Sequence, residues 1–235
     1  MDPLETIAAP TASRPMLGLT VLVVEDSLYA SEALRLLCLR SGARIRRADC
    51  LRSAHRHLQV YRPSVAVVDL GLPDGSGAEL IGELTRGAAR LGVVAAMSGD
   101  PGTEAAAREA GAQIFFEKPM TSLAAFQQAI LAQLPEEYRR SGPRALPAEP
   151  IEPDPVAYKD DMAHAAELLQ EATDRQTLFY LGQFLQGVAR CAGDEELQAA
   201  ADHLSSRLAE DQPIRSDLGQ LAGLLQARVG QRMAI

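Results

Sequence analysis

The sequence predicts two folded parts, an α/β domain with a five-stranded, doubly wound parallel sheet and, after it, an all-α helical bundle. Short apolar runs alternate with helical stretches in the first half of the chain, which is typical of repeated β-α units. A proline-rich segment then ends this alternation. The residues beyond it carry helical patterns but few strand-like runs, so we expect an α/β domain joined to a helical module.

Five apolar runs in the first half have the length and composition of buried strands. A stretch with helical periodicity follows each run, as in LAAFQQAILAQL at residues 123–134. Right-handed crossovers between such units require a parallel sheet with helices on both faces, and we expect the strand order 2-1-3-4-5. The expected strands are residues 20–25, 43–48, 64–69, 92–97 and 113–117.

Six prolines between residues 135 and 155 predict a semi-rigid, extended linker. Beyond the linker, apolar residues at spacings of three and four predict a small antiparallel bundle. Asp174 and Asp194 stand where N-caps belong, and Gly193 is placed to end the second helix. The expected helices are residues 156–172, 174–191, 194–209 and 214–233. The expected domains are a disordered arm (1–16), the α/β domain (17–134), the linker (135–155) and an acidic helical domain (156–235).

Charge is uneven along the chain. Residues 151–235 hold 7 Lys and Arg against 14 Asp and Glu, so they carry almost all of the net charge of −8. Proteins bind nucleic acid by neutralising phosphates with Lys and Arg, and an acidic module is therefore a poor candidate for reading DNA or RNA. Arginines on and around the second expected strand could form an anion patch, but a solvated edge strand protected by charge is the better interpretation. These residues are Arg44, Arg46, Arg47 and Arg52.

The remaining composition favours a cytoplasmic protein with no membrane partner. Three cysteines are odd in number and widely spaced, which matches neither a disulfide framework nor a metal site. No stretch approaches the roughly 18 to 20 apolar residues that span a bilayer. Prolines at positions 3, 10 and 15 interrupt the segment where a signal peptide would be apolar.

Charged side chains stand at the ends of three expected strands. Glu25 and Asp26 close the first strand, Asp69 closes the third, and Lys118 follows the fifth. Ligands of open α/β folds bind at the carboxyl edge of the sheet, so these groups should converge there. An all-oxygen carboxylate cluster suits Mg²⁺, and Asp69 could attack a phosphoryl group while Lys118 neutralises its charge. Ser98, at the end of the fourth strand, could donate a hydrogen bond to a phosphoryl oxygen.

Taken together, these signals resemble the receiver domain of two-component response regulators, a flavodoxin-like fold. The resemblance covers about residues 18–134, or half of the chain. It is specific because separated signatures occur in order at the expected strand ends. They are Glu25-Asp26, Asp69 followed by LGLPDGSG (70–77), Ser98-Gly99 and Lys118-Pro119.

This resemblance implies a role for each of the site residues. Asp69 would be the phosphoacceptor and also a metal ligand. Asp26 would bind Mg²⁺ directly and Glu25 would help through water. The backbone carbonyl of Gly71 would be the third protein oxygen on the metal.

Lys118 and Ser98, by the same resemblance, would sense the phosphoryl group. Phe115 would take the place of a rotating aromatic switch, although it lacks the hydroxyl of the commoner tyrosine and could equally be core packing. Gly75 and Gly77 are interpreted as turn glycines that shape the loop into the third helix.

The resemblance also implies partners and a signalling role. A histidine kinase or a histidine phosphotransfer protein would phosphorylate Asp69, and the chain would catalyse only its own magnesium-dependent phosphorylation and dephosphorylation. His164 and His203 lie in HAAELL and HLSSRL, which do not match a phosphotransfer motif. The helical module is expected to bind a protein, either a second copy or an unknown output partner. The alternatives are a DNA-binding transcriptional regulator with a divergent helix-turn-helix, and a phosphate sink.

Overall fold

A computed structural model describes residues 10–86, 91–136 and 150–230 of the chain. Its central feature is a parallel sheet of five strands in the order β2-β1-β3-β6-β7, which confirms the predicted order of the strands along the sheet. Every predicted strand is present to within one residue at each end. The strands are β1 (Thr20–Val24), β2 (Arg44–Ala48), β3 (Val65–Asp69), β6 (Val93–Ser98) and β7 (Ile114–Glu117).

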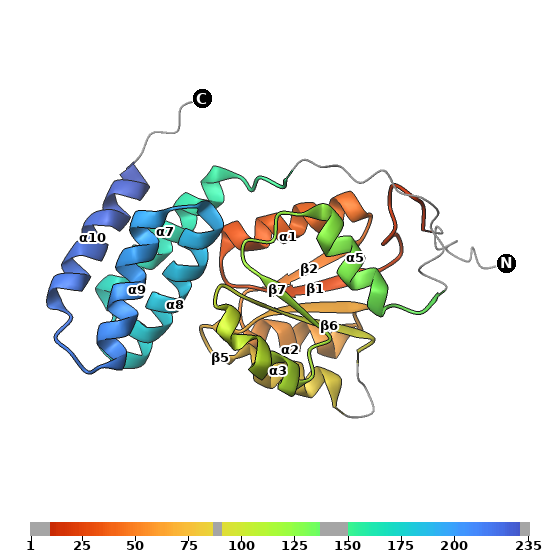
Figure 1. Cartoon of the computed structure of the whole chain (residues 1–235), viewed down its shortest axis with the longest axis horizontal. Helices are drawn as coiled ribbons and strands as arrows, with labels where there is room; N and C mark the ends of the chain where they lie inside the picture. Colours follow the sequence, from red (N-terminus) through yellow and green to blue (C-terminus); the bar gives the residue numbers. More distant parts are fainter. Residues whose placement is uncertain (1–9, 87–90, 137–149, 231–235) are drawn as a thin grey trace.

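Helices cover both faces of this sheet (Figure 1). One core joins α1 and α5 to residues such as Val21 and Val67, and a second core joins α2, α3 and α4 to Leu22 and Val68 on the opposite face. Adjacent strand residues point to opposite faces, and both faces of the inner strands are buried, so β1, β3 and β6 are nearly continuous apolar runs. The helices are α1 (Leu28–Ser41), α2 (Leu51–Val60), α3 (Gly77–Thr85), α4 (Glu104–Ala110) and α5 (Leu123–Gln133), with a 3₁₀ turn, η1 (Pro101–Thr103), before α4.

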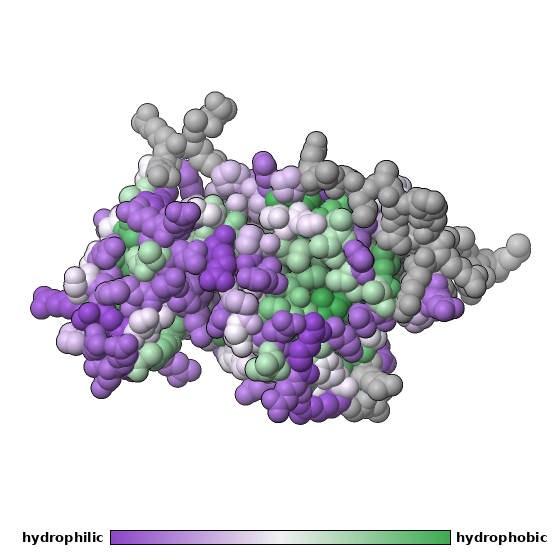
Figure 2. Space-filling model, in the orientation of Figure 1, coloured by the Kyte–Doolittle hydropathy of each residue, from purple (hydrophilic) through white to green (hydrophobic). Residues whose placement is uncertain are grey.

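The arginine-rich strand β2 lies at the edge of the sheet, as the sequence indicated. Arg44, Arg46 and Arg47 are exposed there, while Ala48 at the end of the strand is buried. Figure 2 shows apolar residues gathered on the surface of the α/β domain around α5, whereas the visible face of the helical module is mostly hydrophilic.

The helical module is a four-helix bundle that begins with α7 (Pro155–Glu171) and ends with α10 (Arg215–Gly230), with α8 (Arg175–Ala192) and α9 (Glu195–Ala209) between them. As predicted, Asp174 caps α8 by accepting from the Thr177 amide, and Asp194 caps α9. Gly193 ends α8 with a left-handed backbone, φ +68°. The predicted apolar stripes form the bundle core, except that Val229, near the end of α10, is 43% exposed.

The structure differs from the expected arm and linker at one residue of each. Residues 1–9 of the expected arm and 137–149 of the expected linker lie outside the described residues. Met16, in the last position of that arm, is fully buried in the α/β core. Ile151, within the expected linker, is buried in the same core and donates its amide to the Thr121 carbonyl at 3.0 Å. The chain is thus held on the α/β domain a few residues before α7 begins. No helix in the described ranges is long and apolar enough to cross a membrane.

Candidate functional site

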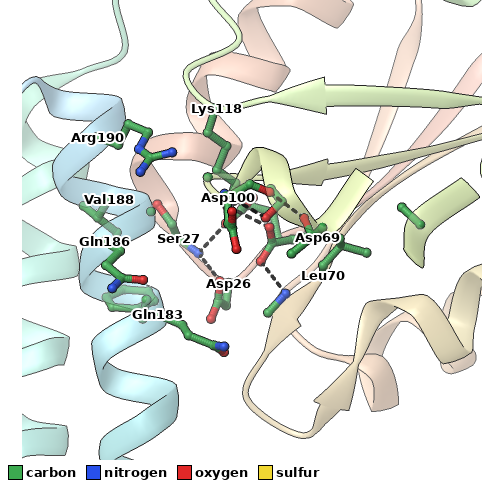
Figure 3. Close-up of a pocket in the computed structure, with 18 of the residues that line it drawn as sticks. Asp26, Ser27, Asp69, Leu70, Asp100, Lys118, Gln183, Gln186, Val188 and Arg190 are labelled. Carbon is green, nitrogen blue, oxygen red and sulfur yellow. Dashed lines mark hydrogen bonds and ion pairs between the residues drawn. The ribbon is translucent and has the colours of Figure 1, made fainter. Parts of the chain in front are cut away.

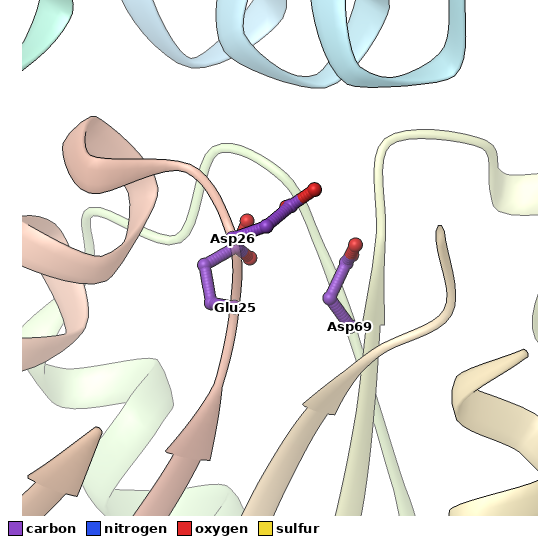
Figure 4. A group of neighbouring side chains, drawn as sticks. All are labelled: Glu25, Asp26 and Asp69. Carbon is purple, nitrogen blue, oxygen red and sulfur yellow. The ribbon is translucent and has the colours of Figure 1, made fainter. Parts of the chain in front are cut away.

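Three carboxylates meet at the carboxyl edge of the sheet. Glu25 and Asp26 follow β1, and Asp69 is the last residue of β3. These strands pair in parallel with Val24 beside Val68, so the register alone brings their ends together. One carboxylate oxygen from each residue lies within 4.8 Å of the others (Figure 4). The structure therefore brings together the three acids that the sequence singled out.

Lys118 completes the cluster at the same carboxyl edge of the sheet. It follows β7, and its Nζ lies 2.9 Å from Asp69 Oδ1 and 2.8 Å from Glu25 Oε2. Only 5% of this residue is exposed. Burial alone would lower the pKa of Lys118, but the charges of Asp69 and Glu25 outweigh it and hold that pKa well above its usual range. The lysine is therefore a fixed positive charge beside Asp69.

The cluster has more negative than positive charge. Burial raises the pKa of Glu25 well above its usual value, and the carboxylates of Asp69 and Asp26 raise it further, against the opposing effect of Lys118. Burial and the Asp69 charge raise the pKa of Asp26 to about 6. A single ammonium thus does not compensate three clustered carboxylates. A hard divalent cation with oxygen ligands would relieve this repulsion, so the donor set fits Mg²⁺.

Ser98 and Phe115 lie in different surroundings, Ser98 in the cavity and Phe115 against the core. Ser98 ends β6 and lines the cavity beside Asp69, where its Oγ accepts from the Asp100 amide at 3.1 Å. The Ser98 hydroxyl proton remains available for another acceptor. Phe115 is half-buried and packs against the core under α2, α3 and α4. The structure thus brings Ser98 to the cluster and places Phe115 in a packing position on the sheet.

Two glycines shape the loop between Asp69 and α3. Gly75 has φ +150°, which a side chain would strain, and it belongs to the small hairpin of β4 (Gly71–Leu72) and β5 (Gly75–Ser76). A Cβ on Gly77 would lie 1.9 Å from the Asp69 carbonyl oxygen. Glycine is therefore required at position 77 because α3 begins against the backbone of Asp69. This agrees with their interpretation as turn glycines. Gly71 lines the cavity and donates its amide to Asp69 Oδ2 at 3.2 Å.

A cavity of about 310 Å³ opens over these residues, and one of its walls is helix α8 of the helical module (Figure 3). This contribution comes from residues more than 100 positions away and was not predicted from the sequence. Tyr180 of α8 donates its hydroxyl to Asp26 Oδ2 at 2.6 Å. A pattern on α8 could have indicated this contact. Tyr180, Gln183 and Gly187 recur at spacings of three and four, on the face of the helix opposite its apolar stripe. The α8 residues that line the cavity are Gln183, Phe184, Gln186, Gly187, Val188 and Arg190.

The two histidines of the module are engaged elsewhere. The His164 ring packs edge-to-face on Phe184, with 5.9 Å between ring centroids. His203 Nδ1 lies 2.5 Å from Asp217 Oδ1. Neither histidine lines the cavity above Asp69.

The geometry defines a doubly wound α/β domain with a candidate cation site at its carboxyl edge, and comparison with known proteins identifies its family. Residues 21–130 match the model of the response regulator receiver domain. This part of the chain is therefore a receiver domain of the response regulator family, as its motifs predicted.

Individual proteins resemble the chain over limited stretches. It is 32% identical over 99 residues to the KDP operon transcriptional regulatory protein KdpE of Escherichia coli, covering 42% of this chain and 44% of that protein. It is 41% identical over 61 residues to the virulence transcriptional regulatory protein PhoP of Salmonella typhimurium strain 14028s, covering 26% of this chain and 27% of that protein. The matches thus span less than half the length of these relatives. A solved receiver domain of a histidine kinase from Syntrophus aciditrophicus is 24% identical, covers 55% of this chain and 98% of that one, and has a TM-score of 0.46.

Proposed function

We propose that this chain is a two-component response regulator whose phosphoacceptor is Asp69. The observation that carries the proposal is the pairing of Lys118 Nζ with both Asp69 and Glu25 in a buried cluster that also contains Asp26. A carboxylate attacks a phosphodianion poorly unless cations screen the charge of both reactants. Lys118 supplies one of these charges next to the attacking oxygen.

In the proposed reaction an Asp69 oxygen attacks the phosphorus of a phosphohistidine. The new O–P bond forms as the P–N bond breaks, and the histidine nitrogen leaves with its electron pair and takes up a proton. Mg²⁺, held by Asp26, Asp69 and the Gly71 carbonyl with Glu25 acting through water, would supply charge neutralisation at the phosphoryl oxygens. Lys118 and Ser98 would then pair with and hydrogen-bond those oxygens. The aromatic ring of Phe115 would move in response.

The donor in this proposal is a histidine kinase or a histidine phosphotransfer protein. Beyond its own magnesium-dependent phosphorylation and dephosphorylation, the chain would catalyse no reaction. The output would be a protein contact of the helical module, with a second copy or with another protein, because a net charge of about −7 opposes approach to DNA. The second candidate is a DNA-binding transcriptional regulator, since KdpE and PhoP are both named as transcriptional regulatory proteins.

Intact-mass measurement with acetyl phosphate and Mg²⁺ tests the assignment of Asp69. We expect one phosphoryl group on the wild type and none on Asp69→Asn, and chelation of the metal should abolish the modification. Asp100→Asn is the matched control, because Asp100 lines the same cavity but lies outside the carboxylate cluster. Equal phosphate uptake by Asp69→Asn, or uptake that survives chelation, would refute the proposal.

A mobility-shift assay at about 150 mM salt separates the two outputs, since phosphate contacts weaken steeply with salt. The full chain, with and without phosphoramidate, should not shift random or promoter DNA. Sequence-specific binding that survives at this salt concentration would favour the transcriptional regulator.

A further inference from the structure

One face of α8 lies directly over the proposed phosphorylation site. Tyr180, Gln183 and Gly187 stand at positions i, i+3 and i+7, so they share this face. The Tyr180 hydroxyl donates to Asp26 Oδ2 at 2.6 Å, and Gln183 extends toward the strand ends (Figure 3). The opposite face of α8 carries Leu181 and Leu185, which are fully buried in the bundle core. The helix thus joins the bundle on one side and the receiver site on the other.

The backbone of α8 runs close to the site, and glycines stand on both sides of this contact. A Cβ on Gly99, in the turn after β6, would lie 3.7 Å from the Gly187 Cα, and a Cβ on Gly187 would lie 3.8 Å from Lys118 Nζ. A Cβ on Gly71 would lie 3.6 Å from Gln183 Oε1 and 3.7 Å from Asp69 Oδ2. The Gln183 carboxamide and the Asp69 carboxylate therefore flank the same point.

A second contact comes from α7. Asp161 is 2% exposed, and its carboxylate accepts from the Ser27 hydroxyl at 2.8 Å and from the amides of Leu28 and Tyr29 at 2.8 and 3.0 Å. These amides belong to the first turn of α1 and therefore have no partner within that helix. The helix dipole also favours a negative charge at this end. Helix α7 thus supplies a cap to a helix of the receiver domain, directly after the metal-site residue Asp26.

These contacts place α8 where a protein phosphodonor would have to approach the site. Such a donor must bring a histidine ring to the phosphoryl group opposite Asp69, and in this chain α8 already covers that approach. The α8 side chains that line the cavity include no histidine, and the amide nitrogen of Gln183 is not nucleophilic and cannot carry a phosphoryl group. Small donors differ, because the cavity of about 310 Å³ is large enough to admit them.

We propose that the helical module is a built-in cover of the phosphorylation site, held closed by Tyr180 and Asp161, and that it must move away before a protein phosphodonor can reach Asp69. The proposal rests on the proposed function of Asp69. Closure also opposes the chemistry directly, since the Tyr180 hydroxyl bonds Asp26 Oδ2 and would compete with a metal ion for this oxygen. Linkage is reciprocal, so phosphorylation should in turn favour the open form.

A bulky side chain at position 187 tests the closed arrangement. In Gly187→Trp the indole would have to fit between α8 and Lys118, and the cover should open, whereas Gly223→Trp on α10 meets no atoms within 4 Å of its Cβ. Hydrogen exchange of the Leu28 and Tyr29 amides, which Asp161 protects, should become about tenfold faster in the Gly187 variant and stay unchanged in the control.

Asp161→Ala, with Asp160→Ala as its exposed neighbour control, should have the same effect without adding bulk. Unchanged protection in both Gly187→Trp and Asp161→Ala would overturn the closed arrangement.

The rate of Asp69 phosphorylation by phosphoramidate and Mg²⁺ then tests the consequence. Because opening frees Asp26, the rate should rise several-fold in Gly187→Trp and Asp161→Ala, but not in their controls. Faster exchange with no gain in rate would overturn the inhibitory role. Absence of phosphorylation in every variant, including the wild type, would refute the function of Asp69 while the exchange data still report whether the module is docked.

Discussion

The receiver domain and the helical module contribute to the same site by different physical means. In the receiver domain, strand register places the groups of the proposed site, because Asp69 ends β3 while Glu25 and Lys118 directly follow β1 and β7 at the same edge of the sheet. In the module, α8 and α7 place Tyr180 and Asp161 through docking between two separately packed parts. The described core residues of the module form their own cluster, distinct from both receiver cores. The receiver half of the site is thus fixed by the fold, whereas the module half depends on contacts between two separately packed cores.

The largest expected effect tests the receiver half. Lys118→Met keeps most of the side-chain volume but removes the charge, which leaves buried carboxylates uncompensated at a cost of about 3–5 kcal/mol in the free energy of unfolding. Urea unfolding at pH 8 should show this loss, and Mg²⁺ should restore part of it. At pH 5 the loss should be smaller, because Glu25 and Asp26, whose pKa values are already raised, take up protons. An equal loss at both pH values would contradict the electrostatic account of the cluster.

The next effect should be confined to the module. Asp194 caps α9, accepts from the Tyr158 hydroxyl at 2.6 Å and pairs with Arg228 at 2.8 Å. Asp194→Ala should cost about 1–2 kcal/mol, with faster hydrogen exchange in α9 and α10 but not in the receiver strands. Arg228 is the main cause that lowers the pKa of Asp194 to about 2, so this stabilisation is present above pH 4 and should be lost as the pH falls toward 2. Asp202→Ala, at an exposed position of the same helix, is the control. Equal loosening of the receiver strands would show that the two parts unfold as one.

Magnesium should stabilise the receiver domain in a pH-dependent way. At tenfold excess over its dissociation constant, a ligand of the folded state adds about 1.4 kcal/mol. The raised pKa of Asp26, about 6, means that the folded state keeps a proton that the unfolded state releases, so stability without metal falls as the pH rises from about 4 to 6. Magnesium needs the ionised form, and its effect on the melting temperature should be larger at pH 8 than at pH 5. A pH-independent effect would place the ion elsewhere.

The smallest expected effect concerns the contact between Tyr180 of the helical module and Asp26 of the receiver domain. Tyr180→Phe removes the hydroxyl that donates to Asp26, so magnesium affinity should rise about threefold, in line with the net free energy of one hydrogen bond. Tyr158→Phe is the matched control, because its hydroxyl bonds Asp194 inside the module. Calorimetric titration measures both. Identical affinities in the two variants would argue against competition at Asp26.

The receiver half could be predicted from the sequence because its signals are local. Apolar runs that end in Asp26, Asp69 or Lys118 predict both a strand and the edge at which its last side chain lies. The caps Asp174 and Asp194 and the turn glycine Gly193 likewise act within a few residues of themselves. Short-range patterns of this kind specify the order of the elements and the positions of the groups at their ends.

The module half could not be predicted, because its contacts join residues more than 130 positions apart, such as Asp161 with Leu28 or Tyr180 with Asp26. In the sequence Asp161 is one acidic residue among many on a helix, and Gln183 is an ordinary polar residue. The dense prolines indicated a spacer between independent parts, but Ile151 is buried in the receiver core and holds the chain close to the start of α7. Docking depends on the shape and charge of two assembled surfaces, which no single stretch of sequence contains.

Hydrogen exchange at the start of α1, with and without phosphorylation, tests the coupling of the two halves most directly. The amides of Leu28 and Tyr29 report docking because both are bonded to Asp161. After phosphoramidate and Mg²⁺ have modified the wild type, as verified by intact mass, these amides should exchange faster, while Asp69→Asn treated in the same way should keep its protection. Full protection of both amides in wild-type protein that is completely phosphorylated on Asp69 would contradict the account.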